Sequence, residues 1–403
     1  MLKANTRFEY LLLFLIINDV LFGDLNFTPY LLILFFSILI YTLDIFSIKI
    51  KHTHFYNLYD YMVMIFLIVW LYGVVLGLVL NDLQGAVQNF AGMSLMVLYF
   101  LKKSYPMQSS ENCVRTVINI GMYFLVIYFL VILTSPAKIN LSILDQEGTS
   151  AFRLYWSSGL AILIALCILS FEIILNPQKY KKIYKFRSWS FLHSFRWMIF
   201  LVCLLMIFLS GSKGFYLAFL TLISIIILFK IFRSLINLRL NIKAVIIFGV
   251  TIIILGFIYY IFKQEIELII ITEFSELSHR SIQKNELLND STFFGKGLGA
   301  PVTNGYVRDE LGYGFELSFH NIFHKFGIFS LPIFTLYCYI ILIGLKGLLS
   351  RNTCKYIESI VVLCLISFLI PSYGNPIIFA PINILLTILS IKILGGFKNE
   401  AQL

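Results

Sequence analysis

The feature that most constrains this chain is a succession of long apolar runs, separated by short polar stretches. A membrane-spanning helix needs about 20 apolar residues, and about twelve runs reach or approach that length. The chain is 59% hydrophobic and 13% charged, whereas soluble domains carry about 25% charged residues. We therefore predict an all-α integral membrane protein in which residues 1–403 form a single polytopic domain.

The apolar runs and the basic residues between them predict a topology. The predicted spans cover 8–22, 28–48, 59–80, 85–101, 113–134, 154–175, 197–210, 215–229, 244–262, 320–345, 356–370 and 377–394. Cytoplasmic loops carry an excess of Lys and Arg, and most of the 31 basic residues fall on one side when both termini are cytoplasmic. The basic residues behind the net charge of +10 are therefore expected to set the orientation of the spans and to contact anionic membrane lipid. A nucleic-acid partner is disfavoured.

Two loops stand on the predicted outer side of the membrane. The longer one, 263–319, begins with helical spacing and alternating charges, which predicts a surface helix. It continues through the glycine-rich stretch STFFGKGLGAPVTNGYVRDELGYG (291–314). The shorter one, 135–153, has a similar composition. Because long loops in compact proteins are usually functional or disordered, and these contain many apolar side chains, we expect the longer loop to be functional.

Three basic residues on this outer side are candidates for binding phosphate. Lys213 lies in the tight turn SGSKG, Arg153 where the shorter loop meets the next span, and Arg280 on the expected surface helix. The planar guanidinium group suits bidentate contact with diphosphate oxygens. For each of the three, contact with a lipid headgroup or a surface ion pair is the alternative.

Two histidines close the long loop at the start of the tenth predicted span. His320 and His324 are four residues apart and share one face of a helix. A metal site needs further ligands, and no third one stands nearby in the sequence, so we expect no metal. His320 is a candidate general base because imidazole titrates near neutral pH, and an interfacial histidine without chemistry is the alternative. The sequence leaves open whether His324 and Lys325 face the interior or the headgroups.

Four stretches, in this order, resemble the bacterial O-antigen polymerase and ligase superfamily. They are SGSKG (210–214), HRSIQKNELL (279–288), FFGKGLG (293–299) and ELSFHNIFHKFGIFSLP (316–332). The resemblance implies a membrane glycosyltransferase that uses a polyprenyl-diphosphate-linked glycan as donor and acceptor, with no cofactor. It also implies the helical, GT-C-like fold of lipid-sugar-dependent glycosyltransferases, placed in the bacterial inner membrane, and a possible chain-length regulator as a protein partner.

The resemblance also assigns residues. It matches Arg280 to the family's loop arginine, Lys213 to the basic residue of the turn, and His320 to the histidine of the His-Asn pair. Arg153 matches less clearly, and Lys213 stands where arginine is commoner, so bidentate contact is lost there. In chemical terms, fixed cations stabilise a departing diphosphate without a metal, His320 activates the attacking hydroxyl, and Glu316 orients the imidazole.

The complete set of candidate site residues follows from these assignments. The expected catalytic residues are His320, Arg280 and Glu316, and the expected substrate-binding residues are Lys213, Arg153, Asn321, Gly297, Gly299 and Tyr313. Three aromatic residues of the long loop, Tyr306, Tyr313 and Phe315, are expected either to stack on sugar rings or to pack the loop itself.

Three functions are compatible with these features. The expected one is polymerisation of lipid-linked oligosaccharide repeats into O-antigen, capsule or a related surface polysaccharide. A ligase that moves the finished glycan to a lipid core uses the same donor and is the close alternative. A flippase or exporter of lipid-linked sugars belongs to a different class, and it would carry its charges in mid-membrane helices rather than at the outer surface.

Overall fold

The structure is a computed structural model. It describes residues 58–103, 140–146, 149–155, 213–236, 279–306, 312–350 and 353–399, together with short helical pieces between 163 and 260. The first, second and fifth predicted spans lie outside these residues, and only pieces of the sixth, seventh and ninth lie within them.

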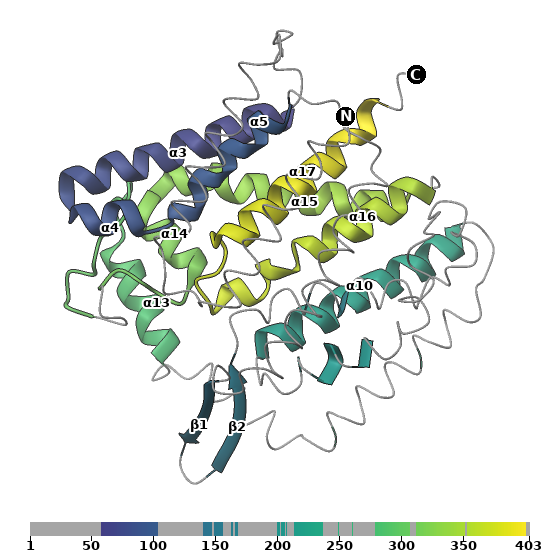
Figure 1. Ribbon diagram of the computed structural model, residues 1–403, viewed down its shortest axis with the longest axis horizontal. Coiled ribbons are helices and arrows are strands. Elements are labelled where there is room, and N and C mark those ends of the chain that lie inside the picture. Colours follow the sequence, from purple (N-terminus) through teal and green to yellow (C-terminus); the bar gives the residue numbers. More distant parts are fainter. Residues whose placement is uncertain are drawn as a thin grey trace, which may run out of the picture.

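The described part of the chain is mostly helical (Figure 1). The α-helices are α3 (Leu58–Leu80), α4 (Leu83–Gln88), α5 (Leu98–Lys103), α10 (Lys213–Ile236), α13 (His279–Asp290), α14 (Ser318–Phe326), α15 (Ser330–Leu348), α16 (Thr353–Leu365) and α17 (Pro381–Asn399). The 3₁₀ helices are η1 (Ala91–Val97), η4 (Gly327–Phe329), η5 (Ser367–Leu369) and η6 (Pro371–Tyr373). The predicted surface helix is present as α13.

Three described helices are long and apolar enough to cross a membrane, by length and composition. They are Leu58–Leu80, Gly214–Phe232 and Ser318–Leu348, and they coincide with the third, eighth and tenth predicted spans. Shorter apolar helices at Ala91–Phe100, Glu358–Tyr373 and Pro381–Leu394 overlap the fourth, eleventh and twelfth. The prediction of a helical protein of membrane type is confirmed at this level.

Two predicted segments differ from the structure. The fourth span is not one continuous helix, because Phe90 adopts a left-handed conformation (φ 54°) between α4 and η1. Contact of its ring with Phe379, at 4.8 Å between centroids, accompanies this break. Most of the segment predicted as the shorter outer loop forms two antiparallel strands, β1 (Asn140–Gln146) and β2 (Thr149–Tyr155), so the sixth span begins later than predicted.

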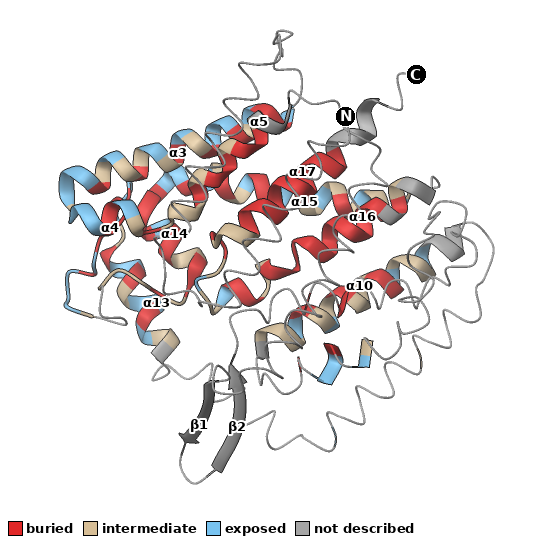
Figure 2. Ribbon diagram, in the orientation of Figure 1, coloured by how far each residue is buried: buried red, intermediate tan, exposed pale blue. Residues whose placement is uncertain are grey.

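The core lies between α3, α15, α16 and α17. Figure 2 shows buried residues along most of α16 and α17, whereas exposed residues mark the outer side of α3. Those exposed residues are apolar, among them Ile68, Val75 and Val79. An apolar outer face is what a helix in contact with lipid requires, because lipid offers no hydrogen bonds.

The glycine-rich part of the long loop is packed between α3 and α14. The amide of Leu298 donates to the Gly73 carbonyl oxygen of α3 (N···O 2.9 Å), and that of Gly297 donates to the Lys325 carbonyl oxygen of α14 (2.9 Å). The Asn81 side-chain amide also donates to the Lys296 carbonyl oxygen (2.8 Å). The loop thus joins two helices that are far apart in sequence, α3 and the last turn of α14.

Candidate functional site

An ion pair joins α13 to the segment that leads into α14. Arg280 Nε lies 3.8 Å from Glu316 Oε2, and the two side chains are 40% and 30% exposed. Between them and the core, Gln283 Oε1 accepts the amide of Leu317 (3.0 Å) and so fixes the start of α14 against α13. The contact places Glu316 beside the guanidinium group, and both side chains are accessible to solvent.

His320 lies in the first turn of α14 and is half-buried. Its Nδ1 is buried and has no hydrogen-bond partner among the residues that the structure describes. The ammonium group of Lys284, one helical turn after Arg280, interacts electrostatically with the imidazole. A buried polar atom without a partner is costly, and a water molecule or ligand that reached this nitrogen would remove that cost.

A third element, the polar turn Pro371–Asn375, completes the surroundings of these residues. The ring of Tyr373 meets that of His320 edge-on, with centroids 6.3 Å apart. A Cβ atom built on Gly374 would lie 3.1 Å from the guanidinium carbon of Arg280, so the guanidinium rests against this glycine. Ser318 Oγ donates to the Asn375 carbonyl oxygen (2.7 Å), which attaches the turn to α14.

The start of α10 lies against the same turn. Gly214 packs on Pro371, where an added Cβ would lie 3.0 Å from the proline Cβ. Lys213 is the first residue of α10, so its backbone is next to the turn, while its side chain lies outside the described part. Four segments that are distant in sequence therefore meet here: the start of α10, α13, the start of α14 and the turn at 371–375.

Arg153 and Asn321 are placed differently. Arg153 lies in β2, opposite Ser142 of β1, and its side chain is outside the described part. Asn321 follows His320 in α14, but its side chain is 1% exposed, and its Oδ1 has no partner among the described residues. Asn321 is thus in the protein interior rather than on the surface.

The expected substrate glycines serve to pack the loop. Gly297 and Gly299 have φ values of +79° and +76°, which side chains other than glycine rarely adopt. A Cβ on Gly297 would lie 2.5 Å from the Gly77 nitrogen, and one on Gly299 would lie 2.4 Å from the Gly85 carbonyl carbon. Backbone contact with α3 and α4 accounts for both glycines without a ligand.

The three aromatic residues expected either to stack on sugar rings or to pack the loop, Tyr306, Tyr313 and Phe315, make contacts within the protein. The Tyr313 hydroxyl donates to Gln88 Oε1 (3.1 Å) beside α4. Phe315 is fully buried in a small second core with Leu287, Val302 and Leu317, and Tyr306 packs against it. Of the two alternatives for these residues, the geometry favours packing of the loop.

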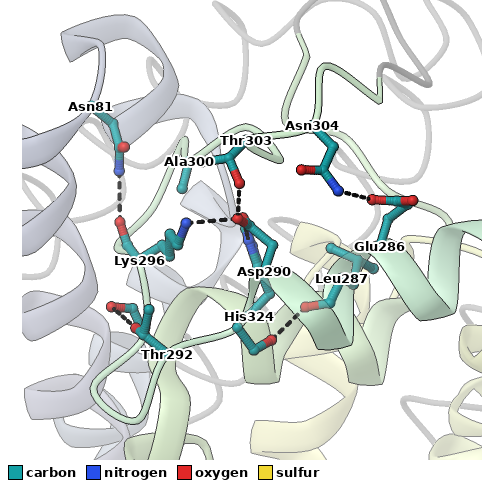
Figure 3. Close-up of polar contacts among 12 residues, drawn as sticks. Asn81, Glu286, Leu287, Asp290, Thr292, Lys296, Ala300, Thr303, Asn304 and His324 are labelled. Carbon is teal, nitrogen blue, oxygen red and sulfur yellow. Dashed lines mark hydrogen bonds and ion pairs between the residues drawn. The ribbon is translucent and has the colours of Figure 1, made fainter.

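A polar cluster formed by Asp290, Lys296, Thr303 and His324 lies at the other end of α13, and its Asp290 and His324 side chains are buried (Figure 3). Asp290 accepts hydrogen bonds from Lys296 Nζ (2.8 Å) and Thr303 Oγ1, and its Oδ2 lies 2.8 Å from His324 Nε2. Burial raises the pKa of Asp290, but the three hydrogen bonds outweigh it and lower the pKa from 3.8 to about 2. We refer to these four residues as the Asp290 cluster.

The cluster also answers the question that the sequence left open for His324 and Lys325. Both side chains are fully buried, so they face the protein interior. Lys325 donates to the Ala300 carbonyl oxygen and lies 5.0 Å from the centroid of the Phe315 ring. Both residues therefore attach the loop to α14.

Among the described residues, no group of three or more His, Cys, Asp and Glu side chains is placed to hold a metal ion. The chain was also compared with protein-family models, with curated proteins and with solved structures, and no match was found.

The sequence interpretation overlooked several residues that the structure brings to the site or its support. Tyr373 and Gly374 lie in PSYGNP, which reads in sequence as a simple connection between the last two spans. Its signal was the density of turn-forming and polar residues in an otherwise apolar region. Lys284 had a signal too, since it stands one turn after Arg280. Asp290 had none, because its partners are set by tertiary packing.

Proposed function

We propose that this protein is a membrane glycosyltransferase of the bacterial inner membrane that polymerises polyprenyl-diphosphate-linked oligosaccharide repeats into O-antigen or a related surface polysaccharide. The proposal includes about twelve spans with cytoplasmic termini and a GT-C-like fold. The observation that carries it is the meeting of Arg280, Glu316 and His320 with the turn at 371–375 and the start of α10. Cations and an imidazole at one end of apolar helices suit a diphosphate-activated sugar at a membrane surface.

In this proposal the anomeric carbon of the donor glycan loses its bond to a diphosphate oxygen and gains one to a hydroxyl oxygen of the acceptor. Polyprenyl diphosphate leaves with the bonding electron pair. Arg280 stabilises the negative charge that develops on the leaving oxygen, and Lys213 adds a second positive charge from the start of α10. His320 accepts the proton of the attacking hydroxyl and returns it to water.

Glu316 holds the guanidinium group in this scheme, because its observed contact is with Arg280. At 3.8 Å and partial exposure the ion pair is weak, so a diphosphate is able to displace the carboxylate. Arg153 is kept as a second candidate for the donor diphosphate, since the hairpin is part of the predicted outer side.

Cells that lack this protein, complemented with wild-type or His320→Ala chains, test the proposal. We expect wild type to restore long polysaccharide and His320→Ala to give single-repeat decoration of the surface. Thr335→Ala, at an exposed position on α15, is the control and should behave as wild type. Full-length polysaccharide from a correctly inserted His320→Ala chain would refute the catalytic role. Unattached long chains in the deletion strain would instead indicate a ligase.

Two further measurements test whether the reaction needs a metal ion and on which side of the membrane the site lies. Purified protein should elongate lipid-linked repeats equally well in Mg²⁺ and in EDTA, because the proposed charge stabilisation uses protein cations alone. A topology reporter inserted after Asn304, an exposed loop residue, should report the outer side of the membrane. A cytoplasmic signal from that reporter would remove the site from the side where the proposal needs it.

A further inference from the structure

We infer that Tyr373 is a sugar-binding platform of this site, which contacts the acceptor sugar that carries the attacking hydroxyl. The inference rests on the proposed function, because it assumes that the substrate is a glycan. It adds a binding residue from a segment that carries none of the motifs found in the sequence.

The first observation is that an aromatic side chain is held exposed on a firmly attached turn. Tyr373 is 53% exposed. The turn beneath it is fixed by Ser372 Oγ, which donates to the Phe368 carbonyl oxygen (2.6 Å), and by the link from Ser318 to Asn375. The ring is therefore presented by ordered backbone, and little conformational freedom remains to be lost on binding.

The second observation is the position of this ring between the two chemical groups of the site. Its centroid is 6.3 Å from that of the His320 imidazole, and the next residue, Gly374, supports the Arg280 guanidinium. A hydroxyl that approaches His320 must belong to a sugar that lies beside Tyr373. The sugar's C–H face then meets an apolar ring, and the phenol hydroxyl, which has no hydrogen-bond partner among the described residues, faces the sugar's own hydroxyls.

The third observation is that the three aromatic residues of the long loop first considered for sugar stacking, Tyr306, Tyr313 and Phe315, are otherwise engaged. Tyr313 is hydrogen-bonded to Gln88, and Phe315 is fully buried. Among the described residues near Arg280 and His320, Tyr373 is thus the exposed ring that can meet a sugar. A tyrosine at the membrane interface is the competing explanation for such exposure, and the experiment below separates the two.

The experiment measures binding and elongation separately, with full-length protein in lipid nanodiscs. The binding probe is the repeat-unit oligosaccharide of the host strain, released from its lipid by mild acid. We expect Tyr373→Ala to raise both its dissociation constant and its KM as acceptor about tenfold, with a smaller change in kcat. Tyr373→Phe should retain most of the affinity because it keeps the ring. Tyr61→Ala, which removes a tyrosine of similar exposure (48%) from α3, is the matched control and should bind as wild type.

The outcomes distinguish this inference from the proposed function. Unchanged binding and KM in Tyr373→Ala, with active wild type, would overturn the platform and leave the polymerase standing. Weakened binding in Tyr373→Ala, with no elongation by wild type, would support the platform and refute the polymerase. If wild type neither binds nor elongates, both fail. If Tyr373→Ala lowers membrane insertion or thermal stability but not oligosaccharide binding, Tyr373 is a membrane anchor and the inference is wrong.

Discussion

The two ends of α13 contact the α14 region in opposite ways. At the first end, Arg280 and Glu316 form a pair at 3.8 Å whose side chains are 40% and 30% exposed. At the last end, Asp290 and His324 meet at 2.8 Å with side chains that are 4% and 0% exposed. One helix pair thus carries an accessible ion pair and, a few turns away, a buried hydrogen bond from the His324 imidazole to the Asp290 carboxylate.

The difference separates two tasks within one helix pair. A buried charge that loses its partner is strongly destabilising, whereas an exposed pair contributes little to stability. The Asp290 cluster can therefore hold the loop in a fixed position against α14. At the Arg280 end the ion pair is exposed, so an anionic substrate can reach its charges.

The largest expected effect is at the buried end. Replacing Asp290 with Ala leaves the partly exposed Lys296 without its carboxylate and the buried His324 without its acceptor, so we expect a loss of about 3 kcal/mol in the free energy of unfolding. Thermal unfolding in detergent measures this. Glu286→Ala is the matched control, because it breaks an exposed hydrogen bond between the same helix and the same loop, from Asn304 (2.7 Å). If Glu286→Ala lowered the free energy of unfolding as much as Asp290→Ala, the proposed difference between the buried and the exposed contacts would be contradicted.

At the exposed end of α13 we expect a substitution to affect activity strongly and stability weakly. We expect Arg280→Ala to lower the rate of elongation about 100-fold or more, through lost stabilisation of the leaving diphosphate. Its unfolding free energy should change by less than about 1 kcal/mol. Arg280→Lys should recover part of the rate because the charge remains while the bidentate geometry is lost. Lys346→Ala, which removes a cation at the far end of α15, serves as control. A rate drop that merely follows a loss of folded protein would contradict the prediction.

Acid should affect the buried end selectively. The folded-state pKa of Asp290, about 2, lies below the ordinary value of 3.8, so its ionised form stabilises the fold. That contribution, about 2 kcal/mol, is fully present above pH 4 and is lost as the pH falls from about 4 to about 2. Unfolding measured over this range should show a steeper loss for wild type than for Asp290→Asn. If stability fell equally with pH in wild type and in Asp290→Asn, Asp290 would not be the cause of the acid sensitivity.

The smallest expected effect concerns Gly374, which supports the Arg280 guanidinium at the exposed end of α13. Gly374 has an ordinary backbone (φ −116°), so Gly374→Ala strains no dihedral angle, but its Cβ would lie 3.1 Å from the Arg280 guanidinium carbon. We expect the guanidinium to move and elongation to fall about tenfold, with stability unchanged. Gly344→Ala is the matched control, because its Cβ would meet a Leu363 methyl group at 3.2 Å, away from the site. Equal activity of the two variants would refute the supporting role of Gly374.

Hydropathy predicted the helices that are long and uninterrupted, and it failed where a segment depends on its neighbours. α3 and α10 were predicted because lipid imposes length and apolarity on each span. The break at Phe90 lies inside an apolar run, and the contact with Phe379 that accompanies it is visible only in three dimensions. The hairpin at 140–155 was missed because strands of seven residues fall below the length of a span.

The candidate site was predictable in part for similar reasons. Arg280 and His320 stood out because cations and imidazoles on the outer side break the expected distribution of charge. The roles of Gly297 and Gly299 were not predictable, since a glycine required by backbone packing and one required by a ligand look alike in sequence. Tyr373 and Gly374 acquire their meaning only from the residues that they contact, which come from another part of the chain.

The docking of the long loop onto α3 has a consequence for synthesis of the protein. The hydrogen bond from Tyr72 to the Phe294 carbonyl oxygen joins residues 222 positions apart. At about 5–20 residues per second, translation leaves α3 in the membrane for on the order of 10 to 40 s before this loop exists. Until then Gly73 and Gly77 face lipid or water in place of the loop backbone. Assembly of Arg280 with His320 is thus among the late events of folding, and a chain released early inserts its first helices without acquiring the site.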